Sequence, residues 1–230
     1  GRLKLGSLLF QKLLTQEYSR IICGHVLVTP LISPLSRLFQ VPYSVMTYGK
    51  EVWETVPPLQ LRALKRAHDI WTIRRHSRDL ACTANGLNPH KFRMLPPVID
   101  GKLFTPGEKN PELLAHYRLH NCRVLMTVAR LWSGDIYKGV DVTIPALPNI
   151  LKVFREVKYL VVGRGDDQPR LAKLAEDLGV SDRVVFAGFV PNDALVDHYR
   201  LADAYVMPSK EGFGIVYLEA MACGVPTLSG

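Results

Sequence analysis

Short apolar runs alternate with amphipathic segments along the whole chain. In the second half, four of the runs are almost continuously apolar: Val124–Ala129, Tyr159–Gly163, Val184–Gly188 and Ala204–Pro208. Strands of a parallel sheet that helices cover on both faces have this pattern. The segments that separate and follow the runs have helical spacing, at about 139–155, 168–179, 191–201 and 213–223. The pattern therefore predicts an α/β domain in which strands and crossover helices alternate.

The first half repeats the pattern with shorter elements. We expect strands at Arg20–Cys23, Tyr43–Thr47, Asp69–Ile73 and Phe92–Leu95, and helices at about 26–39, 57–67 and 76–86. Between the halves, segment 100–121 is rich in Gly, Pro and charged residues and starts no long apolar run, which is typical of a linker. We therefore predict a partial first domain at 1–105, a linker at 106–122 and a second domain at 123–230.

Composition narrows the class of protein. The chain is 47% hydrophobic and 22% charged, which excludes a disordered chain. No apolar run reaches the roughly 18 residues that a transmembrane helix needs. The start of the chain does not have the pattern of a secretory signal, and Cys23, Cys82, Cys122 and Cys223 form no CxxC motif. We expect reduced, mostly buried thiols and a cytoplasmic location. The chain does not begin with Met and stops on a half-made strand, so we expect a fragment.

The positive charge is confined to one half of the chain. Residues 1–115 hold 16 Lys and Arg against 8 Asp and Glu, whereas residues 116–230 hold 13 against 13. This asymmetry suggests that the first half meets an anionic partner, such as nucleic acid, phospholipid or a phosphorylated substrate. The alternative is that the excess of Lys and Arg only makes the surface of the first half soluble.

The segment from Glu211 to Glu219 carries the clearest chemistry. The helix expected there is apolar nearly all round and should be buried, so Glu219 in its middle needs a partner. A sugar or ribose diol fits, because two hydroxyls can donate to the two carboxylate oxygens. Gly212 and Gly214 leave backbone N–H groups uncovered at the helix start, where a phosphate is favoured. The structural alternative is a glutamate that caps a turn and a core glutamate that is paired.

Two cations flank the loop that follows the first strand of the second domain. Arg130 comes just after that strand, and Lys138 comes just before the next helix. Carboxyl ends of parallel strands meet at one sheet edge, where open α/β sheets bind their ligands. Together the two side chains can neutralise a diphosphate and its departing charge.

The order of these motifs resembles the donor domain of the retaining glycosyltransferases of family 4. The motifs are Arg130 with Lys138-Gly139, Val162-Gly163-Arg164-Gly165, Phe186-Ala187-Gly188-Phe189-Val190, Met207-Pro208-Ser209, and Glu211 seven residues before Glu219. The resemblance covers about residues 20–230. It implies the GT-B fold, with two Rossmann-like domains that each have a parallel sheet. From the resemblance we expect the first domain to be incomplete here and the second to lack its end.

The resemblance also implies roles for particular residues. The donor is a nucleotide diphosphate sugar, whose diphosphate Arg130 and Lys138 would hold. Glu211 would contact the transferred sugar, and Glu219 would bind the ribose. The implied catalytic residues are Glu211, Arg130 and Lys138. The remaining donor-binding residues are Gly212, Phe213 and Gly214 at the phosphate and sugar, with Phe189 and Val190 beside the base.

On the acceptor side, the resemblance points to the loop with Tyr48, Gly49 and Glu51. Many family members have a histidine where this chain has Tyr48. The acceptor itself stays open between a sugar, a lipid-linked sugar and a small molecule, and nucleic acid is not expected. The implied reaction moves a hexose to an acceptor hydroxyl with retained configuration, and no obligatory metal or other cofactor is implied. The alternatives are a sugar-nucleotide epimerase of the same fold and an inactive fragment that binds nucleotide sugar.

Two segments mix leucines with cations, at 1–17 and 59–67. On helices they could lie on an anionic membrane surface, which would make the protein peripheral on the inner face of a membrane. The alternative is that the leucines pack on the sheet while the cations are solvated.

Other candidate sites are weaker. Gly163-Arg164-Gly165 lacks the third glycine of a dinucleotide fingerprint. Asp166-Asp167 fits a helix start better than a metal site. The seven histidines show no spacing typical of metal ligands or of a catalytic triad.

Overall fold

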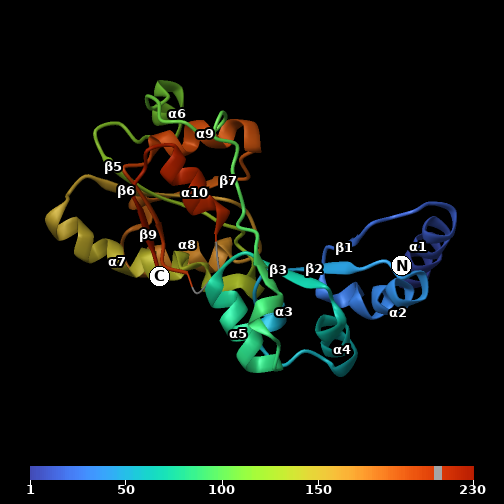
Figure 1. The fold of residues 1–230 in the computed structure, drawn as a ribbon. Coiled ribbons are helices and arrows are strands. Elements are labelled where there is room, and N and C mark those ends of the chain that lie inside the picture. Colours follow the sequence, from blue (N-terminus) through green and yellow to red (C-terminus); the bar gives the residue numbers. More distant parts are fainter. Residues whose placement is uncertain (210–213) are drawn as a thin grey trace. The chain divides into compact units, whose positions relative to one another are not determined.

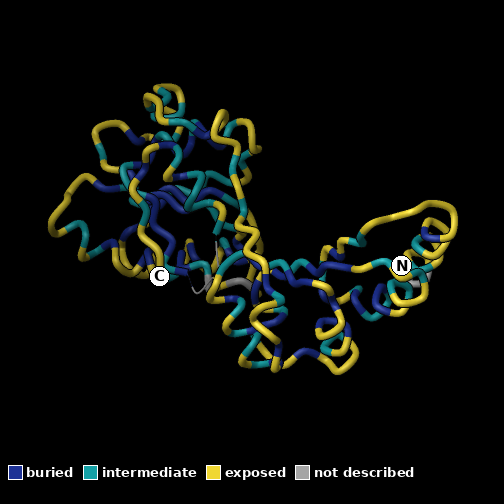
Figure 2. Tube along the Cα trace, viewed as in Figure 1, coloured by how far each residue is buried: buried dark blue, intermediate teal, exposed yellow. Residues whose placement is uncertain are grey.

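The protein folds into two compact units, Gly1–Pro97 and Val98–Gly230, in a computed structural model that describes residues 1–209 and 214–230 (Figure 1). Each unit has one sheet in which every pair of neighbouring strands is parallel. Strands of both sheets are mostly buried, whereas most exposed residues lie in loops and on outer helix faces (Figure 2). The predicted α/β class with two Rossmann-like sheets is confirmed.

The sheet of the first unit has the order β1-β2-β3-β4. Its strands are β1 (Ile21–Cys23), β2 (Tyr43–Thr47), β3 (Asp69–Thr72) and β4 (Phe92–Met94). Its helices are α1 (Arg2–Thr15), η1 (Val26–Val28), α2 (Thr29–Phe39), α3 (Lys50–Trp53), α4 (Pro58–Arg66), α5 (Arg75–Asn85) and η2 (Pro89–Lys91). The core lies around Val45, Leu64 and Ile70, whose side chains are fully buried. All four predicted strands are confirmed, and α3 is an addition inside the acceptor-side loop.

At the amino end of this sheet, the buried Asp69 forms an ion pair with Arg20 (Nη1–Oδ2 3.0 Å). Burial acts to raise the pKa of Asp69, but hydrogen bonds from Ser44 and Arg20 outweigh it and leave the pKa below its usual value. The carboxylate therefore joins β3 to β2 and to the segment before β1.

The sheet of the second unit has the order β7-β6-β5-β8-β9. Its strands are β5 (Arg123–Val128), β6 (Val157–Val162), β7 (Val184–Gly188), β8 (Ala204–Met207) and β9 (Thr227–Ser229). Its helices are α6 (Pro111–His116), η3 (Ser133–Lys138), α7 (Val140–Val153), α8 (Gln168–Asp177), η4 (Ser181–Arg183), α9 (Asn192–Leu201) and α10 (Ile215–Ala222). In the register of the central strands, Met126 of β5 lies opposite Leu160 of β6 and Tyr205 of β8.

Helices cover both faces of this sheet. Tyr159 and Val161 of β6 pack into a core with α7 and α8, whereas Leu160 and Val162 pack into a second core with α9 and α10. Because successive strand residues point to opposite faces, a strand that is buried on both faces is apolar at nearly every position. This is the reason that the continuous apolar runs predicted these strands correctly.

The boundary between the units differs from the predicted linker at 106–122. Phe104 and Leu119 are buried in the core of the second unit. Helix α6 lies on α9, where the Tyr117 hydroxyl and His198 Nε2 are 3.0 Å apart. The chain divides between Pro97 and Val98 instead, because a few apolar side chains anchor this Gly/Pro-rich segment to the second unit.

The expectation that the helix before Cys223 is buried all round is wrong. Ala220 is fully buried, but Ile215 and Met221 are 41% and 57% exposed. Helix α10 packs against α9 and β9, and β9 is the last strand of the sheet. One side of the helix therefore stays open in the described residues.

All four cysteines are free thiols; Cys23 and Cys223 are buried, and Cys82 and Cys122 are half-buried. Burial raises the pKa of each thiol. Among residues 1–209 and 214–230, no helix is both long and apolar enough to cross a bilayer.

Candidate functional site

The carboxyl edge of the second sheet is where three loops meet. Two backbone hydrogen bonds join the loop after β5 to the loop after β6. Leu131 N donates to Arg164 O (3.0 Å), and Asp167 N donates to Leu131 O (2.9 Å). A Cβ on Gly165 would lie 1.7 Å from Leu131 O, so only glycine allows this approach. Gly165 is therefore explained by the packing of these two loops, without a dinucleotide site.

The loop after β5 also meets the loop after β8. Gly139 has φ +81°, and a Cβ there would lie 2.5 Å from Pro208 O. From β5 the chain adds β6 and β7 on one side of the sheet and then β8 and β9 on the other, so the strand order reverses at β5. Ligands of open α/β sheets bind at such a switch point, outside the carboxyl ends of the strands.

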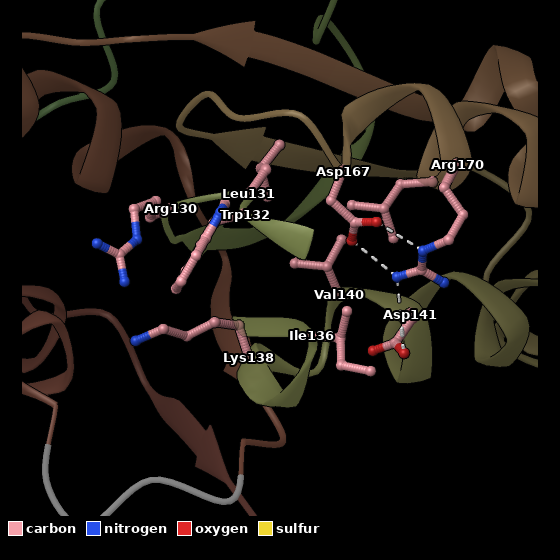
Figure 3. Close-up of a pocket in the computed structure, with 10 residues that line it drawn as sticks. Arg130, Leu131, Trp132, Ile136, Lys138, Val140, Asp141, Asp167 and Arg170 are labelled. Carbon is pink, nitrogen blue, oxygen red and sulfur yellow. Dashed lines mark hydrogen bonds and ion pairs between the residues drawn. The ribbon is translucent and has the colours of Figure 1, made fainter. Parts of the chain in front are cut away.

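Arg130 and Lys138 lie at this switch point. Both line one pocket together with Trp132 and Ile136. Figure 3 shows the two cationic side chains extending to the same side of the pocket, with the Trp132 ring beside Arg130. The Arg130 guanidinium lies 5.1 Å from the centre of that ring, a cation–π contact. The structure thus brings together the two cations that the sequence singled out.

On the other side of the same pocket, Arg170 holds two carboxylates (Figure 3). Its Nε and Nη2 donate to both oxygens of Asp167, at 2.6 and 2.7 Å, and Asp141 Oδ2 lies 3.9 Å from Nη2. Asp167 precedes α8 as expected, but its carboxylate binds Arg170 and makes no capping hydrogen bond. The contact of Arg170 with Asp141 joins the start of α8 to the start of α7.

Asp166 joins the same two loops from the solvent side. Its carboxylate accepts hydrogen bonds from Ser133 N (3.0 Å) and Ser133 Oγ (2.7 Å). These hydrogen bonds lower the pKa of Asp166. The sequence shows Asp166 next to a helix start, but it does not show that the partner lies 33 residues earlier.

Helix α10 begins at the switch point after β8. Gly214 is its N-cap residue, and Glu219 lies in its second turn. The Glu219 side chain is half-buried, and its Oε2 accepts a hydrogen bond from the Tyr199 hydroxyl at 2.7 Å. Glu211, Gly212 and Phe213 lie outside the described residues.

Phe189 and Val190 follow β7 on the same edge. Phe189 is 64% exposed, and the Arg164 guanidinium lies 4.9 Å from its ring centre. Val190 packs against the core next to α9. Arg164 was not predicted as a site residue, although its position directly after a buried strand matches that of Arg130. Arg164 and Arg130 also line a second pocket together with Trp132.

In the first unit, the acceptor-side residues follow β2. The Glu51 carboxylate accepts hydrogen bonds from Tyr48 N (2.5 Å) and Gly49 N (2.9 Å), so it closes the turn that starts α3. The Tyr48 hydroxyl donates to Gly24 O (3.1 Å), and 44% of the residue is exposed. Tyr48 and Gly49 therefore lie at the carboxyl edge of their own sheet, whereas Glu51 mainly shapes the turn.

Comparison with known proteins agrees with this geometry. Residues 120–230, nearly all of the second unit, match the family model of the glycosyl transferases group 1. The chain belongs to this family. It is 33% identical over 214 residues to a GDP-mannose-dependent alpha-(1-6)-phosphatidylinositol monomannoside mannosyltransferase of Mycolicibacterium smegmatis, which covers 87% of this chain and 55% of the relative.

Other relatives agree on the family and the fold. A D-inositol 3-phosphate glycosyltransferase of Acidothermus cellulolyticus is 36% identical over 173 residues, 69% of this chain and 36% of that protein. The crystal structure of Anabaena Alr3699/HepE in complex with UDP superposes with a TM-score of 0.79 at 20% identity, over 99% of this chain and 62% of that chain. This group 1 glycosyltransferase chain spans about half the length of the curated relatives it matches.

Within the part of the chain that the structure describes, no three His, Cys, Asp or Glu side chains gather as metal ligands would. That the donor site needs no metal stays a prediction, as do the roles of the individual site residues.

Proposed function

We propose that the protein transfers a hexose from a nucleotide diphosphate sugar to an acceptor hydroxyl with retention of the anomeric configuration. The observation that carries this proposal is the position of Arg130 and Lys138 on one side of a pocket at the β5–β8 switch point. In this proposal the two cations hold the leaving diphosphate as it gains charge, because prearranged charges of this kind stabilise a transition state.

In this proposal, the C1–O bond to the diphosphate breaks while a C1–O bond to the acceptor forms on the same face of the sugar. The acceptor proton passes to an oxygen of the departing diphosphate. Arg130, Lys138 and Glu211 are the catalytic residues, and Glu219 holds the ribose. Most of the rate enhancement then comes from positioning and from charge stabilisation.

A panel of nucleotide sugars, each with and without an acceptor, tests this function. GDP-mannose is the first donor to use, because the relative from Mycolicibacterium smegmatis is named for it; UDP-glucose and other UDP-sugars follow. Inositol phosphates and phosphatidylinositol mannosides are the first acceptors, again from the relatives' names. Proton NMR of the product is expected to show the donor's own anomeric configuration.

The other outcomes separate the alternative functions. An altered nucleotide sugar without acceptor indicates an epimerase, and binding without turnover indicates a fragment that only binds nucleotide sugar. An inverted product overturns the retaining mechanism. The same reaction with EDTA checks the prediction that no metal is needed, for which an unchanged rate is expected.

We also propose that the first unit meets an anionic membrane surface at the inner face. On α1, Leu5, Leu8 and Leu14 are 44%, 50% and 61% exposed, and Lys4 and Lys12 are exposed beside them. Leu13 is buried, so only part of the helix packs inward. On α4, Leu59 is 65% exposed and the exposed Arg62 and Lys65 follow it. Exposed leucines among cations are the pattern of a helix that lies in a lipid interface.

Flotation with vesicles tests this surface. At low salt, binding to anionic vesicles is expected to exceed binding to neutral vesicles. This binding should weaken at high salt, because dissolved ions screen electrostatic attraction beyond about 8 Å already at physiological salt. Lys12→Glu should weaken it, whereas Lys152→Glu on the second unit should not. Equal recovery with anionic and neutral vesicles at low salt contradicts the proposal.

A further inference from the structure

A buried tyrosine donates a hydrogen bond to the carboxylate of Glu219. Tyr199 lies on α9 and is fully buried, and its hydroxyl donates to Glu219 Oε2 at 2.7 Å. Glu219 itself lies on α10 and is half-buried. A hydrogen bond to a charged group is stronger than one between neutral groups. This contact therefore fixes one oxygen of the carboxylate against the core.

The tyrosine ring is in turn fixed by its neighbours. It packs edge-on against Phe104 (6.0 Å between ring centres) and at a tilt against Tyr205 (5.9 Å). Burial raises the pKa of the Tyr199 hydroxyl far above its ordinary value, so the hydroxyl keeps its proton and acts as a donor. The ring is fully buried between these two neighbours.

The other oxygen of Glu219, Oε1, receives no hydrogen bond from any residue among 1–209 and 214–230. The last torsion of a glutamate side chain is broad, so an unheld carboxylate would rotate freely. With Oε2 held by Tyr199, the lone pairs that remain have a fixed direction. A ribose diol needs this fixed direction, because its two hydroxyls donate in a set geometry.

We propose that Tyr199 is a positioning residue, which orients the Glu219 carboxylate so that it accepts hydrogen bonds from the ribose hydroxyls of the donor nucleotide. The inference rests on the proposed role of Glu219 and adds the residue that makes that role selective for ribose. A tyrosine that only fills the core would contribute stability and no selectivity for the sugar of the nucleotide.

Titration calorimetry of Tyr199→Phe tests this role. The probes are GDP and UDP, each with its 2′-deoxy and 3′-deoxy forms. We expect Tyr199→Phe to weaken binding of the ribonucleotides about tenfold, the effect of one hydrogen bond to a charged group. Binding of the deoxy form that lacks the contacted hydroxyl should weaken less, so the preference for ribose shrinks. Tyr159→Phe is the matched control, since Tyr159 is equally buried and its hydroxyl pairs with Thr127 in the other core.

Glu219→Gln separates failure of this proposal from failure of the proposed function. If Glu219→Gln leaves the ribose preference intact, the ribose role of Glu219 is wrong. If Glu219→Gln abolishes that preference and Tyr199→Phe keeps it at the wild-type level, only the positioning role is overturned. An equal loss for ribose and deoxyribose forms in Tyr199→Phe also overturns it.

The double variant Tyr199→Phe/Glu219→Gln completes the cycle and leaves no buried charge without its donor. We expect its nucleotide affinity to equal that of Glu219→Gln alone, because the tyrosine acts through the carboxylate. A nucleotide affinity of the double variant below that of Glu219→Gln would show that Tyr199 acts independently of Glu219 and would overturn the proposal. This variant keeps the test valid if Tyr199→Phe alone is too unstable to assay.

Discussion

Gly165 is the position at which a single methyl group should disturb both the fold and the donor site. The added Cβ of Gly165→Ala would lie 1.7 Å from Leu131 O and 2.2 Å from Leu131 C, both of them backbone atoms. Contacts of a Cβ below 3.0 Å essentially never occur, so the loops after β5 and β6 have to part by more than 1 Å. Side-chain adjustment cannot relieve this contact.

The size of the effect follows from what this separation breaks. Two backbone hydrogen bonds join the loops, Leu131 N to Arg164 O and Asp167 N to Leu131 O. Each contributes about 1 kcal/mol net, and strain from an inserted methyl group adds about 1–3 kcal/mol. Gly165→Ala is therefore expected to lower the free energy of unfolding of the second unit by about 3–5 kcal/mol. Arg130, which directly precedes Leu131, would move with the loop, so nucleotide diphosphate binding should weaken as well.

Gly101→Ala is the matched control, because a Cβ there meets nothing within 4 Å and no positive φ is involved. Thermal unfolding followed by circular dichroism should show a drop of ~10 °C or more for Gly165→Ala and little change for Gly101→Ala. Of the three tryptophans, Trp132 is the one after residue 97, so its contribution to the total fluorescence reports on the affected loop. Unfolding midpoints that agree within about 2 °C between the two variants would refute the predicted loop contact.

Four other substitutions give further tests. Arg130→Ala and Lys138→Ala should each weaken nucleotide diphosphate binding by about 1.5–3 kcal/mol in calorimetry, and unchanged affinity in both removes the diphosphate assignment. Glu211→Ala should lower turnover more than binding of the bare nucleotide, and a comparison of kcat with the nucleotide Kd detects a contrary result. Asp69 has a lowered folded-state pKa, so its stabilisation of the first unit is present above about pH 4 and lost as the pH falls below it; Asp69→Asn should flatten this dependence in acid unfolding, and an unaltered pH profile contradicts it.

The second sheet could be predicted from sequence because its strands are buried on both faces. Nearly every position of a strand such as β6 is buried against one face or the other, so the apolar run from Tyr159 to Val162 itself defines the element. The segment before β5 offered no such signal. Phe104 and Leu119 anchor it to the second unit, but they stand alone among Gly, Pro and charged residues. Isolated apolar residues show no periodicity, and composition alone favoured a linker.

The helix α10 shows the opposite error. Its residues are apolar nearly all round, which predicts complete burial, yet Ile215 and Met221 are 41% and 57% exposed. The apolar residues of a helix indicate how much of its surface could be buried if other elements surrounded it. They do not say how many neighbours the sheet supplies, and here α10 packs against α9 and β9 only on part of its circumference.

Within the candidate site, what could be predicted depends on how each residue reaches its place. Arg130 and Lys138 directly flank a strand end and a helix start, so the topology of a parallel sheet alone brings them to the switch point. The contact of Tyr199 with Glu219 depends instead on how α9 and α10 pack against each other, because the two residues stand 20 positions apart on different helices. Sequence showed that Glu219 needed a partner, since a carboxylate in an apolar helix is costly. It suggested a ligand where the structure first supplies a tyrosine. The tyrosine binds one carboxylate oxygen, so the paired core glutamate is what the structure shows. The other oxygen is the one that the proposed diol contact uses, and this contact stays a prediction.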